Sequence, residues 1–86
     1  MGDVRYIIYG SDYCGYCLTA VEHLEQEGIE CIFLNMGNDT KSIDETKDYY
    51  SWPTIPIILR NNQASGLVSV VGGYSDLAKE LEEHSE

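Results

Sequence analysis

The sequence has few basic residues and no long hydrophobic segment. Five lysines and arginines stand against fifteen aspartates and glutamates, which gives a formal net charge of −10. Such a chain lacks the cationic surface that binds nucleic acids or anionic membranes. No apolar run approaches the roughly 20 residues that a membrane-spanning helix needs, and no secretory leader pattern is visible. We therefore expect a cytoplasmic protein that binds neither nucleic acid nor membrane.

Cysteine is also scarce, with three residues in the chain. An odd number does not suit a small secreted domain held together by disulfides. In a reducing compartment, a C-x-x-C pair such as Cys14 and Cys17 more often serves catalysis or metal binding than structure. A closed zinc site needs four ligands, and only Cys31, His23 and His84 remain to complete one. Their spacing fits no usual zinc pattern, which favours redox chemistry.

The hydrophobic pattern predicts alternating strands and helices in one α/β domain that covers residues 1–86. We expect strands at 4–9, 31–35, 54–60 and 67–71, and helices at about 15–27, from 40 to about 50, and from about 75 onwards. The order β-α-β-α-β-β-α implies a parallel first βαβ unit with a right-handed crossover. The last two strands should form a hairpin. The result is a four-stranded mixed sheet flanked by three helices.

The two cysteines of the C-x-x-C pair have different expected environments. Cys14 comes directly before a predicted helix, where unpaired N–H groups and the positive end of the helix dipole favour a thiolate. Cys17 falls in the first turn, on the apolar stripe that continues through Val21 and Leu24. This placement predicts an exposed nucleophile at Cys14 and a sheltered resolving thiol at Cys17.

Other polar residues have expected structural roles. Cys31 lies among apolar residues in a predicted strand and should be buried there. His23 is surrounded by glutamates on a predicted helix and should lie at the surface. Either Ser75 or Asp76 should cap the last helix.

Three motifs together resemble those of the glutaredoxins, a family of the thioredoxin superfamily. The first is "CGYC" at 14–17, with tyrosine in third place. The second is "TIP" at 54–56, which is similar to the family's Thr-Val-Pro with its cis proline. The third is "GGYSD" at 72–76, which matches the family's Gly-Gly-x-Ser-Asp. The resemblance covers nearly the whole chain and implies a thioredoxin-like fold.

The resemblance implies a glutathione-dependent thiol–disulfide oxidoreductase. Cys14 would attack a glutathione mixed disulfide, and Cys17 would resolve protein disulfides, for example that of a ribonucleotide reductase. Tyr16 would flank glutathione, the backbone of Ile55 would pair with it like an added strand, and residues 73–76 would hold its γ-glutamyl end. The implied glutathione-binding set is Tyr16, Lys47, Thr54, Ile55, Pro56, Gly73, Tyr74, Ser75 and Asp76.

The sequence departs from the family pattern beside the cysteines. Ser11 stands where glutaredoxins usually carry a lysine that assists the thiolate and binds glutathione's glycine carboxylate. Lys47 is a candidate for that carboxylate, because "KDYYSWPT" resembles a segment of the single-cysteine, iron–sulfur glutaredoxins. Gly15 replaces the proline of the commonest dithiol motif. Some family members with glycine there bind a [2Fe–2S] cluster between two subunits, to which Cys14 and glutathione would supply the thiolates.

Three functions therefore stay open. The first is a monomeric dithiol oxidoreductase that needs no cofactor beyond glutathione as reductant. The second is a [2Fe–2S] carrier or sensor, dimeric only when the cluster is bound. The third is a thioredoxin-like electron donor that a reductase recycles without glutathione. The complete "TIP" and "GGYSD" motifs favour the first.

Overall fold

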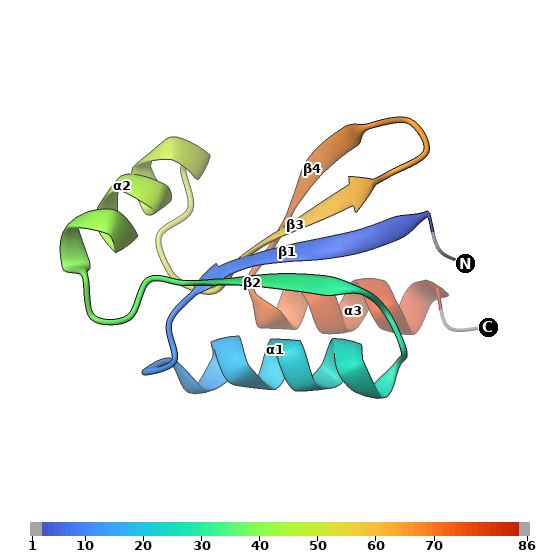
Figure 1. Cartoon of the computed structure of the whole chain (residues 1–86), viewed down its shortest axis with the longest axis horizontal. Coiled ribbons are helices and arrows are strands. Elements are labelled where there is room, and N and C mark those ends of the chain that lie inside the picture. Colours follow the sequence, from blue (N-terminus) through green and yellow to red (C-terminus); the bar gives the residue numbers. More distant parts are fainter. Residues whose placement is uncertain (1–2, 85–86) are drawn as a thin grey trace.

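The computed structural model describes residues 3–84 as one mixed sheet with helices α1 and α3 packed on the same face (Figure 1). The strands are β1 (Val4–Gly10), β2 (Cys31–Asn35), β3 (Ile57–Asn62) and β4 (Leu67–Gly72). The helices are α1 (Gly15–Gln26), α2 (Thr40–Tyr50) and α3 (Tyr74–His84). The predicted element order and α/β fold class are confirmed.

The four strands lie in the order β2-β1-β3-β4. β1 and β2 are parallel, with Tyr6 opposite Cys31 and Gly10 opposite Asn35, because α1 forms the crossover between them. β3 runs antiparallel to both β1 and β4, so the predicted hairpin is confirmed. The carboxyl end of central strand β1 leads directly into the C-x-x-C segment.

The core lies between the sheet and the helix pair α1 and α3. Its buried side chains come from all of these elements: Tyr6, Ile8, Ala20, Leu24, Ile58, Leu77 and Leu81. Side chains alternate between the two faces of a strand, so Ile7 and Tyr9 point to the other face, where they are half-buried. Full burial of a large aliphatic side chain contributes about 1.5–3 kcal/mol, so this layer supplies most of the hydrophobic stabilisation.

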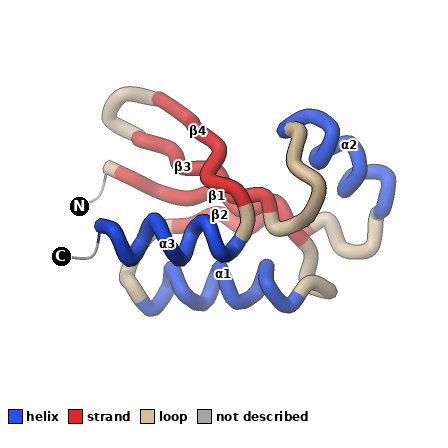
Figure 2. The backbone as a smooth tube through the Cα atoms, turned by 180° about the vertical axis from the view of Figure 1, so that it is seen from behind, coloured by secondary structure: helices blue, strands red, loops and turns tan. Residues whose placement is uncertain are grey.

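Helix α2 lies beyond the end of the sheet, apart from α1 and α3 (Figure 2). The Asp39 carboxylate caps it by accepting a hydrogen bond from Ser42 N at 3.2 Å, and the helix ends at Tyr50, before the C-cap residue Ser51 with its left-handed backbone. No side chain of α2 is fully buried. Among residues 3–84, no helix has the length and hydrophobicity to cross a bilayer.

Strand β3 differs from its predicted bounds of 54–60. It begins at Ile57, because Pro56 has no N–H to donate to a neighbouring strand. It continues to Asn62, which lies opposite Val4. Asparagine has a low strand propensity, so the extension of β3 through two asparagines was not expected. Contacts with residues distant in the sequence explain it.

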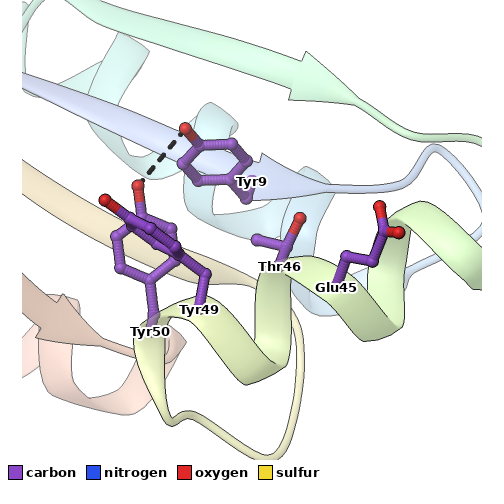
Figure 3. A pocket seen from close by; sticks show the side chains of 5 residues that line it. All are labelled: Tyr9, Glu45, Thr46, Tyr49 and Tyr50. Carbon is purple, nitrogen blue, oxygen red and sulfur yellow. Dashed lines mark hydrogen bonds between the residues drawn. The ribbon is translucent and has the colours of Figure 1, made fainter.

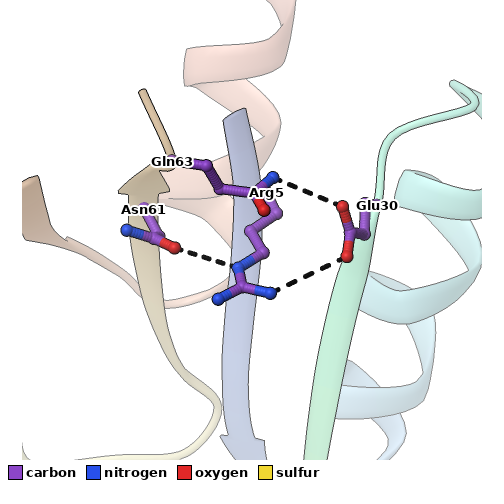
Figure 4. Close-up of polar contacts among 4 residues, drawn as sticks. All are labelled: Arg5, Glu30, Asn61 and Gln63. Atoms are coloured by element: carbon purple, nitrogen blue, oxygen red, sulfur yellow. Dashed lines mark hydrogen bonds and ion pairs between the residues drawn. The ribbon is translucent and has the colours of Figure 1, made fainter. Parts of the chain in front are cut away.

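Those contacts form a polar network on the outer face of the sheet (Figure 4). The Arg5 side chain donates from Nε to Asn61 Oδ1 at 2.9 Å and pairs with Glu30 at 3.8 Å. Gln63 also donates to Glu30, at 3.4 Å. Asn61 Nδ2 donates to the carbonyl of Leu67 at 3.2 Å, so this nearly buried amide joins β1 to the β3–β4 hairpin.

Helix α3 begins one residue before the predicted caps. Tyr74 is already helical, and the Asp76 carboxylate accepts a hydrogen bond from Gly73 N at 3.0 Å. Asp76 therefore lies in the first turn and reaches back to the residue before the helix, as the acidic member of a capping box does. The expectation that Ser75 or Asp76 is the cap residue was wrong.

Candidate functional site

Cys14 is the N-cap residue of α1. Its backbone is extended, with φ −108° and ψ 113°, and its sulfur accepts a hydrogen bond from Cys17 N at 3.2 Å. An oxygen of serine, threonine or aspartate usually fills this role. Because the sulfur replaces it here, the free N–H groups and the positive helix end act directly on the Cys14 sulfur. The predicted place of Cys14 is confirmed, but the side chain is half-buried rather than exposed.

Cys17 is fully buried beneath the end of β1, as predicted. Burial, assisted by a hydrogen bond with the Cys14 side chain, raises the pKa of Cys17 to about 12. An added Cβ on Gly10 would lie 2.5 Å from the Cys17 sulfur and 3.2 Å from Phe33 Cε1, so only glycine leaves room there. At neutral pH the buried thiol therefore keeps its proton beside Cys14.

Ser11, at the expected lysine position, is a buried loop anchor. Its hydroxyl donates to the carbonyl of Gly37 at 2.5 Å and accepts from Tyr13 N at 3.0 Å. Beside it, Asn35 Oδ1 accepts from both Asp12 N and Gly37 N, at 3.1 and 2.8 Å. Ser11 thus fixes the loop before the cysteines and supplies no charge, while Asp12 is exposed to solvent.

The segment around Pro56 faces the Cys14 sulfur. The Cys14 thiol donates a long hydrogen bond of 3.9 Å to the carbonyl of Ile55. The Ile55–Pro56 peptide bond is cis, as the resemblance implies. Pro56 is buried, Ile55 is half-buried and Thr54 is exposed. The "CGYC" and "TIP" motifs therefore meet in space.

The "GGYSD" motif joins the same region through Trp52. Gly72 has φ +126°, and an added Cβ would lie 2.5 Å from Asp76 Oδ2 and 2.9 Å from Trp52 Cζ2. The corresponding position on Gly73 is 3.9 Å from both the Pro56 carbonyl and Trp52 Nε1. Gly72 is required by its left-handed conformation and by this close approach. The indole connects the turn before α3 to the segment before β3.

Two tyrosines and a histidine form a row alongside α1. The Tyr16 ring is 69% exposed and stacks on Tyr74, with centroids 6.2 Å apart and planes at 22°. The Tyr74 hydroxyl shares a hydrogen bond of 3.2 Å with His23 Nδ1. His23 is therefore half-buried and partnered, and with 27% of its side chain exposed the expectation of a surface residue holds only in part. No local sequence pattern links His23 to a residue on α3, so this contact could not be predicted from the sequence.

Lys47 and Cys31 lie outside this cluster. The carbonyl of Lys47 accepts from Trp52 N at 3.0 Å, which connects α2 to the site through the backbone. Cys31 is half-buried at the edge of the core, not fully buried as expected, and burial, with Glu25 and Glu30 nearby, raises its pKa.

A metal-binding cluster was the alternative role for these cysteines. No group of three histidines, cysteines or acids among the described residues is arranged to hold a metal ion. The His84 side chain, weighed as a zinc ligand, lies outside the described part of the chain. The geometry around Cys14 instead brings a thiol, a helix start and a proline-containing loop together.

The parallel βαβ unit, the antiparallel hairpin and a C-x-x-C pair at the start of α1 define a thioredoxin-fold protein. The family model for Glutaredoxin matches residues 6–64. This chain belongs to the glutaredoxin family.

Two curated relatives match with 33% identity over 73 residues, or 85% of this chain. Both are named "Probable monothiol glutaredoxin 2", from Rickettsia prowazekii (strain Madrid E) and Rickettsia typhi (strain ATCC VR-144 / Wilmington). The match covers 62% and 60% of their lengths, so this chain spans about three fifths of each. Unlike a single-cysteine site, the site here contains both Cys14 and Cys17.

Solved structures show the same fold at low sequence identity. Glutaredoxin 1 from Francisella tularensis, complexed with cacodylate, has a TM-score of 0.67 and 19% identity, over 93% of this chain and 94% of that one. Wheat glutaredoxin has a TM-score of 0.71 and 15% identity, over 94% of this chain and 72% of that one. A buckwheat glutaredoxin–glutathione complex has a TM-score of 0.69 and 15% identity, over 93% of this chain and 70% of that one.

Proposed function

We propose that this chain is a glutathione-dependent thiol–disulfide oxidoreductase, with Cys14 as nucleophile and Cys17 as resolving thiol. One observation carries the proposal: the Cys14 sulfur caps α1 and faces the Ile55 carbonyl, while Cys17 lies buried and protonated behind it. The thiolate is the nucleophile in disulfide exchange. Family membership supports this type of redox chemistry.

With a glutathione mixed disulfide, Cys14 alone performs the exchange. Its thiolate attacks the glutathione sulfur, forms a Cys14–glutathione disulfide and releases the other thiol, which takes up a proton. The thiolate of a second glutathione then attacks that disulfide. The Cys14 thiolate is regenerated, and the two glutathione sulfurs leave joined as oxidised glutathione, so glutathione supplies the two electrons of the reduction.

With a protein disulfide, both cysteines take part. Cys14 attacks one substrate sulfur and forms a mixed disulfide, and the other substrate sulfur leaves as a thiol. Cys17 then loses its proton and attacks the Cys14 sulfur, which releases the second substrate thiol and leaves a Cys14–Cys17 disulfide. Two glutathiones reduce this disulfide and leave as oxidised glutathione. Glutathionylated proteins and protein disulfides, such as that of a ribonucleotide reductase, are the proposed substrates.

Glutathione would bind between the Ile55 segment and the start of α3. The Ile55 backbone would pair with its cysteinyl part, with Thr54 and Pro56 holding that segment. The start of α3, comprising half-buried Gly73 and Tyr74 and exposed Ser75 and Asp76, would bind the γ-glutamyl carboxylate and amine. Tyr16 would cover the tripeptide, and Lys47 would attract its glycine carboxylate. The buckwheat glutaredoxin is itself described as a glutathione complex, which supports this ligand.

Three cysteine variants test the roles. We expect Cys14→Ser to abolish the glutathione-coupled reduction of the mixed disulfide between glutathione and 2-mercaptoethanol. Cys17→Ser should keep that reaction and lose reduction of a protein disulfide. Cys31→Ser is the matched control and should behave like the unaltered chain, since Cys31 lies outside the site. Activity retained in Cys14→Ser would overturn the assignment. Reduction supported by a thioredoxin reductase but not by glutathione would favour the electron-donor alternative.

A [2Fe–2S]-binding dimer is a second candidate function, supported by the monothiol name of the relatives and by Gly15. An added Cβ on Gly15 would meet open space apart from its chain neighbours and its own helix backbone, so the first helical residue after Cys14 is unobstructed. Cys17 is buried and its pKa is raised, so Cys14 fits as a cluster ligand and Cys17 does not. A bound cluster would supply electron transfer or be passed on as cargo.

Anaerobic reconstitution with iron, sulfide and glutathione tests this second function. The expected result is visible cluster absorption together with a dimer in size-exclusion chromatography. The Cys17→Ser variant should retain both signals, and Cys14→Ser should lose both. Absorption that is missing in the unaltered chain, or that survives in Cys14→Ser, contradicts the cluster proposal.

A further inference from the structure

An open pocket of about 300 Å³ lies between α2 and β1 (Figure 3). Its lining is aromatic and acidic and consists of Tyr9, Glu45, Thr46, Tyr49 and Tyr50. Tyr9 points to the sheet face opposite the core, because the side chain of its neighbour Ile8 is buried in the core and strand side chains alternate. The proposed redox chemistry uses none of these side chains.

Helical spacing builds one wall of the pocket. Residues four apart on a helix lie above one another, so Glu45 and Tyr49 form one column on α2 and Thr46 and Tyr50 form the next. The Thr46 hydroxyl donates to the carbonyl of Ser42 at 2.8 Å and is occupied within the helix. The wall therefore presents two phenol rings and one carboxylate.

The Tyr50 ring stands between the other two rings. Its centroid is 5.4 Å from that of Tyr9, with planes at 45°, and 4.8 Å from that of Tyr49, at 82°. The Tyr50 hydroxyl donates to the Tyr9 hydroxyl at 3.3 Å. Burial and this contact raise the pKa of Tyr50 to about 12, so its ring stays neutral at physiological pH. The Tyr49 ring is 80% exposed and available to a ligand.

Among the five lining residues, Glu45 is the charged one. Within residues 3–84, no lysine or arginine lies within ion-pair distance of Glu45, although Arg5 and Arg60 pair with other glutamates. The negative faces of aromatic rings attract organic cations, and a carboxylate accepts the N–H groups of a guanidinium. The planar guanidinium combines both contacts better than an ammonium does.

We propose that this pocket binds the arginine side chain of a protein partner. Its volume lies at the lower end of ligand pockets and suits one side chain rather than a larger molecule. The net charge of −10 favours encounter with basic protein surfaces. An arginine delivered by such a partner gains from the whole contact surface, whereas a free cation gains only from the open pocket.

The test is an NMR titration of tyrosine ring signals in the full 86-residue chain with Nα-acetylarginine methylamide. The matched ligand is the citrulline derivative, which has nearly the same shape without the charge. We expect saturable shifts at Tyr9, Tyr49 and Tyr50 with the arginine compound, and at least about threefold weaker binding of citrulline. Equal binding of the two compounds, or no saturable shift, would overturn the proposal.

Variants show which residues bind the arginine compound, and a second ligand shows whether the pocket prefers an arginine side chain to a small free cation. Glu45→Gln should weaken arginine binding about threefold, and Tyr49→Leu should abolish the shifts at the other two rings. Tyr13→Leu, at a residue that is 77% exposed elsewhere, should leave binding unchanged. Tetramethylammonium chloride represents a free small cation, and binding as tight as that of the arginine compound would overturn the assignment to an arginine side chain. The readout involves no cysteine, so it is independent of the redox proposal.

Discussion

The Cys17 sulfur occupies the space next to Gly10 where any other residue would place its Cβ, since the two positions are 2.5 Å apart. The end of β1 and the first turn of α1 therefore fit together at one glycine and one cysteine. The same contact keeps the Cys17 thiol buried. The packing of the sheet and the chemistry of the C-x-x-C pair thus depend on a single missing side chain.

Gly10→Ala should destabilise the fold by about 1–3 kcal/mol, the usual cost of inserting a methyl group into a filled core. Urea unfolding measures the change. Gly15→Ala is the matched control: no atom lies within 4 Å of its added Cβ, and alanine is favoured over glycine in a helix by about 1 kcal/mol. The double variant Gly10→Ala with Cys17→Ala should regain much of the loss. A Gly10→Ala variant as stable as Gly15→Ala would contradict the observed contact.

Iodoacetamide at neutral pH should modify Cys14 and leave Cys17 and Cys31 largely unmodified. Cys17 is fully buried and its pKa is raised to about 12, and burial also raises the pKa of Cys31. Peptide mass spectrometry identifies the modified residue, and a sample in denaturant is the control in which all three cysteines react. Equal labelling of Cys14 and Cys17 in the folded chain would show that the Cys17 thiol is not sheltered.

Folding stability should decrease at alkaline pH. Burial raises the pKa of Cys17 from 9.0 to about 12, and burial with the Glu80 contact raises that of Tyr6 from 10.0 to about 12. Above pH 9 the unfolded chain therefore releases protons that the folded chain keeps, so stability is complete below pH 9 and is lost as the pH rises towards 12.

Urea unfolding at several pH values between about 8 and 11 checks this slope. Cys17→Ala should lose less stability over that interval than the unaltered chain, because one of the groups with a raised pKa has been removed. Equal slopes in both chains would exclude Cys17 as a source of the alkaline loss.

Ser11→Lys should destabilise the chain, although lysine is usual at this position in the family. Ser11 is 2% exposed and its hydroxyl serves Gly37 and Tyr13, so an ammonium there would need to leave the loop or be buried at a cost of several kcal/mol. Ser11→Ala should cost about 1–3 kcal/mol through the unpaired buried groups.

Asp12→Lys is the matched control for this charge. It places a lysine at the neighbouring exposed position and should leave the unfolding free energy nearly unchanged. If Ser11→Lys is as stable as Asp12→Lys, the loop does not depend on the serine contacts.

The sequence predicted those features that repeat or that short motifs define. Apolar patterns, cap residues and prolines located the strands and helices, with β3 displaced from its predicted bounds. The resemblance implied that the motifs at 14–17 and 54–56 act on one ligand, and the Cys14 thiol does contact the Ile55 carbonyl. The order of the elements also followed, because a strand–helix–strand unit has one favoured hand.

Contacts between distant residues were not predictable in this way. His23 binds a tyrosine on α3, and β3 extends through Asn61 because an arginine on β1 and a carbonyl on β4 satisfy its amide. The pocket at Tyr9 and Tyr50 brings together two residues that are 41 positions apart in the sequence. Each of these features depends on how elements pack, which a local pattern does not contain.

Helix α2 contains no fully buried side chain, so it contributes little to the hydrophobic core. The strands with α1 and α3 hold the hydrophobic core, so surface substitutions between residues 40 and 50 have small effects on folding. The same helix provides one wall of the aromatic pocket and leads into the Trp52 segment of the redox site. If the pocket binds an arginine side chain as proposed, natural variation in this helix would change partner choice while the fold is retained.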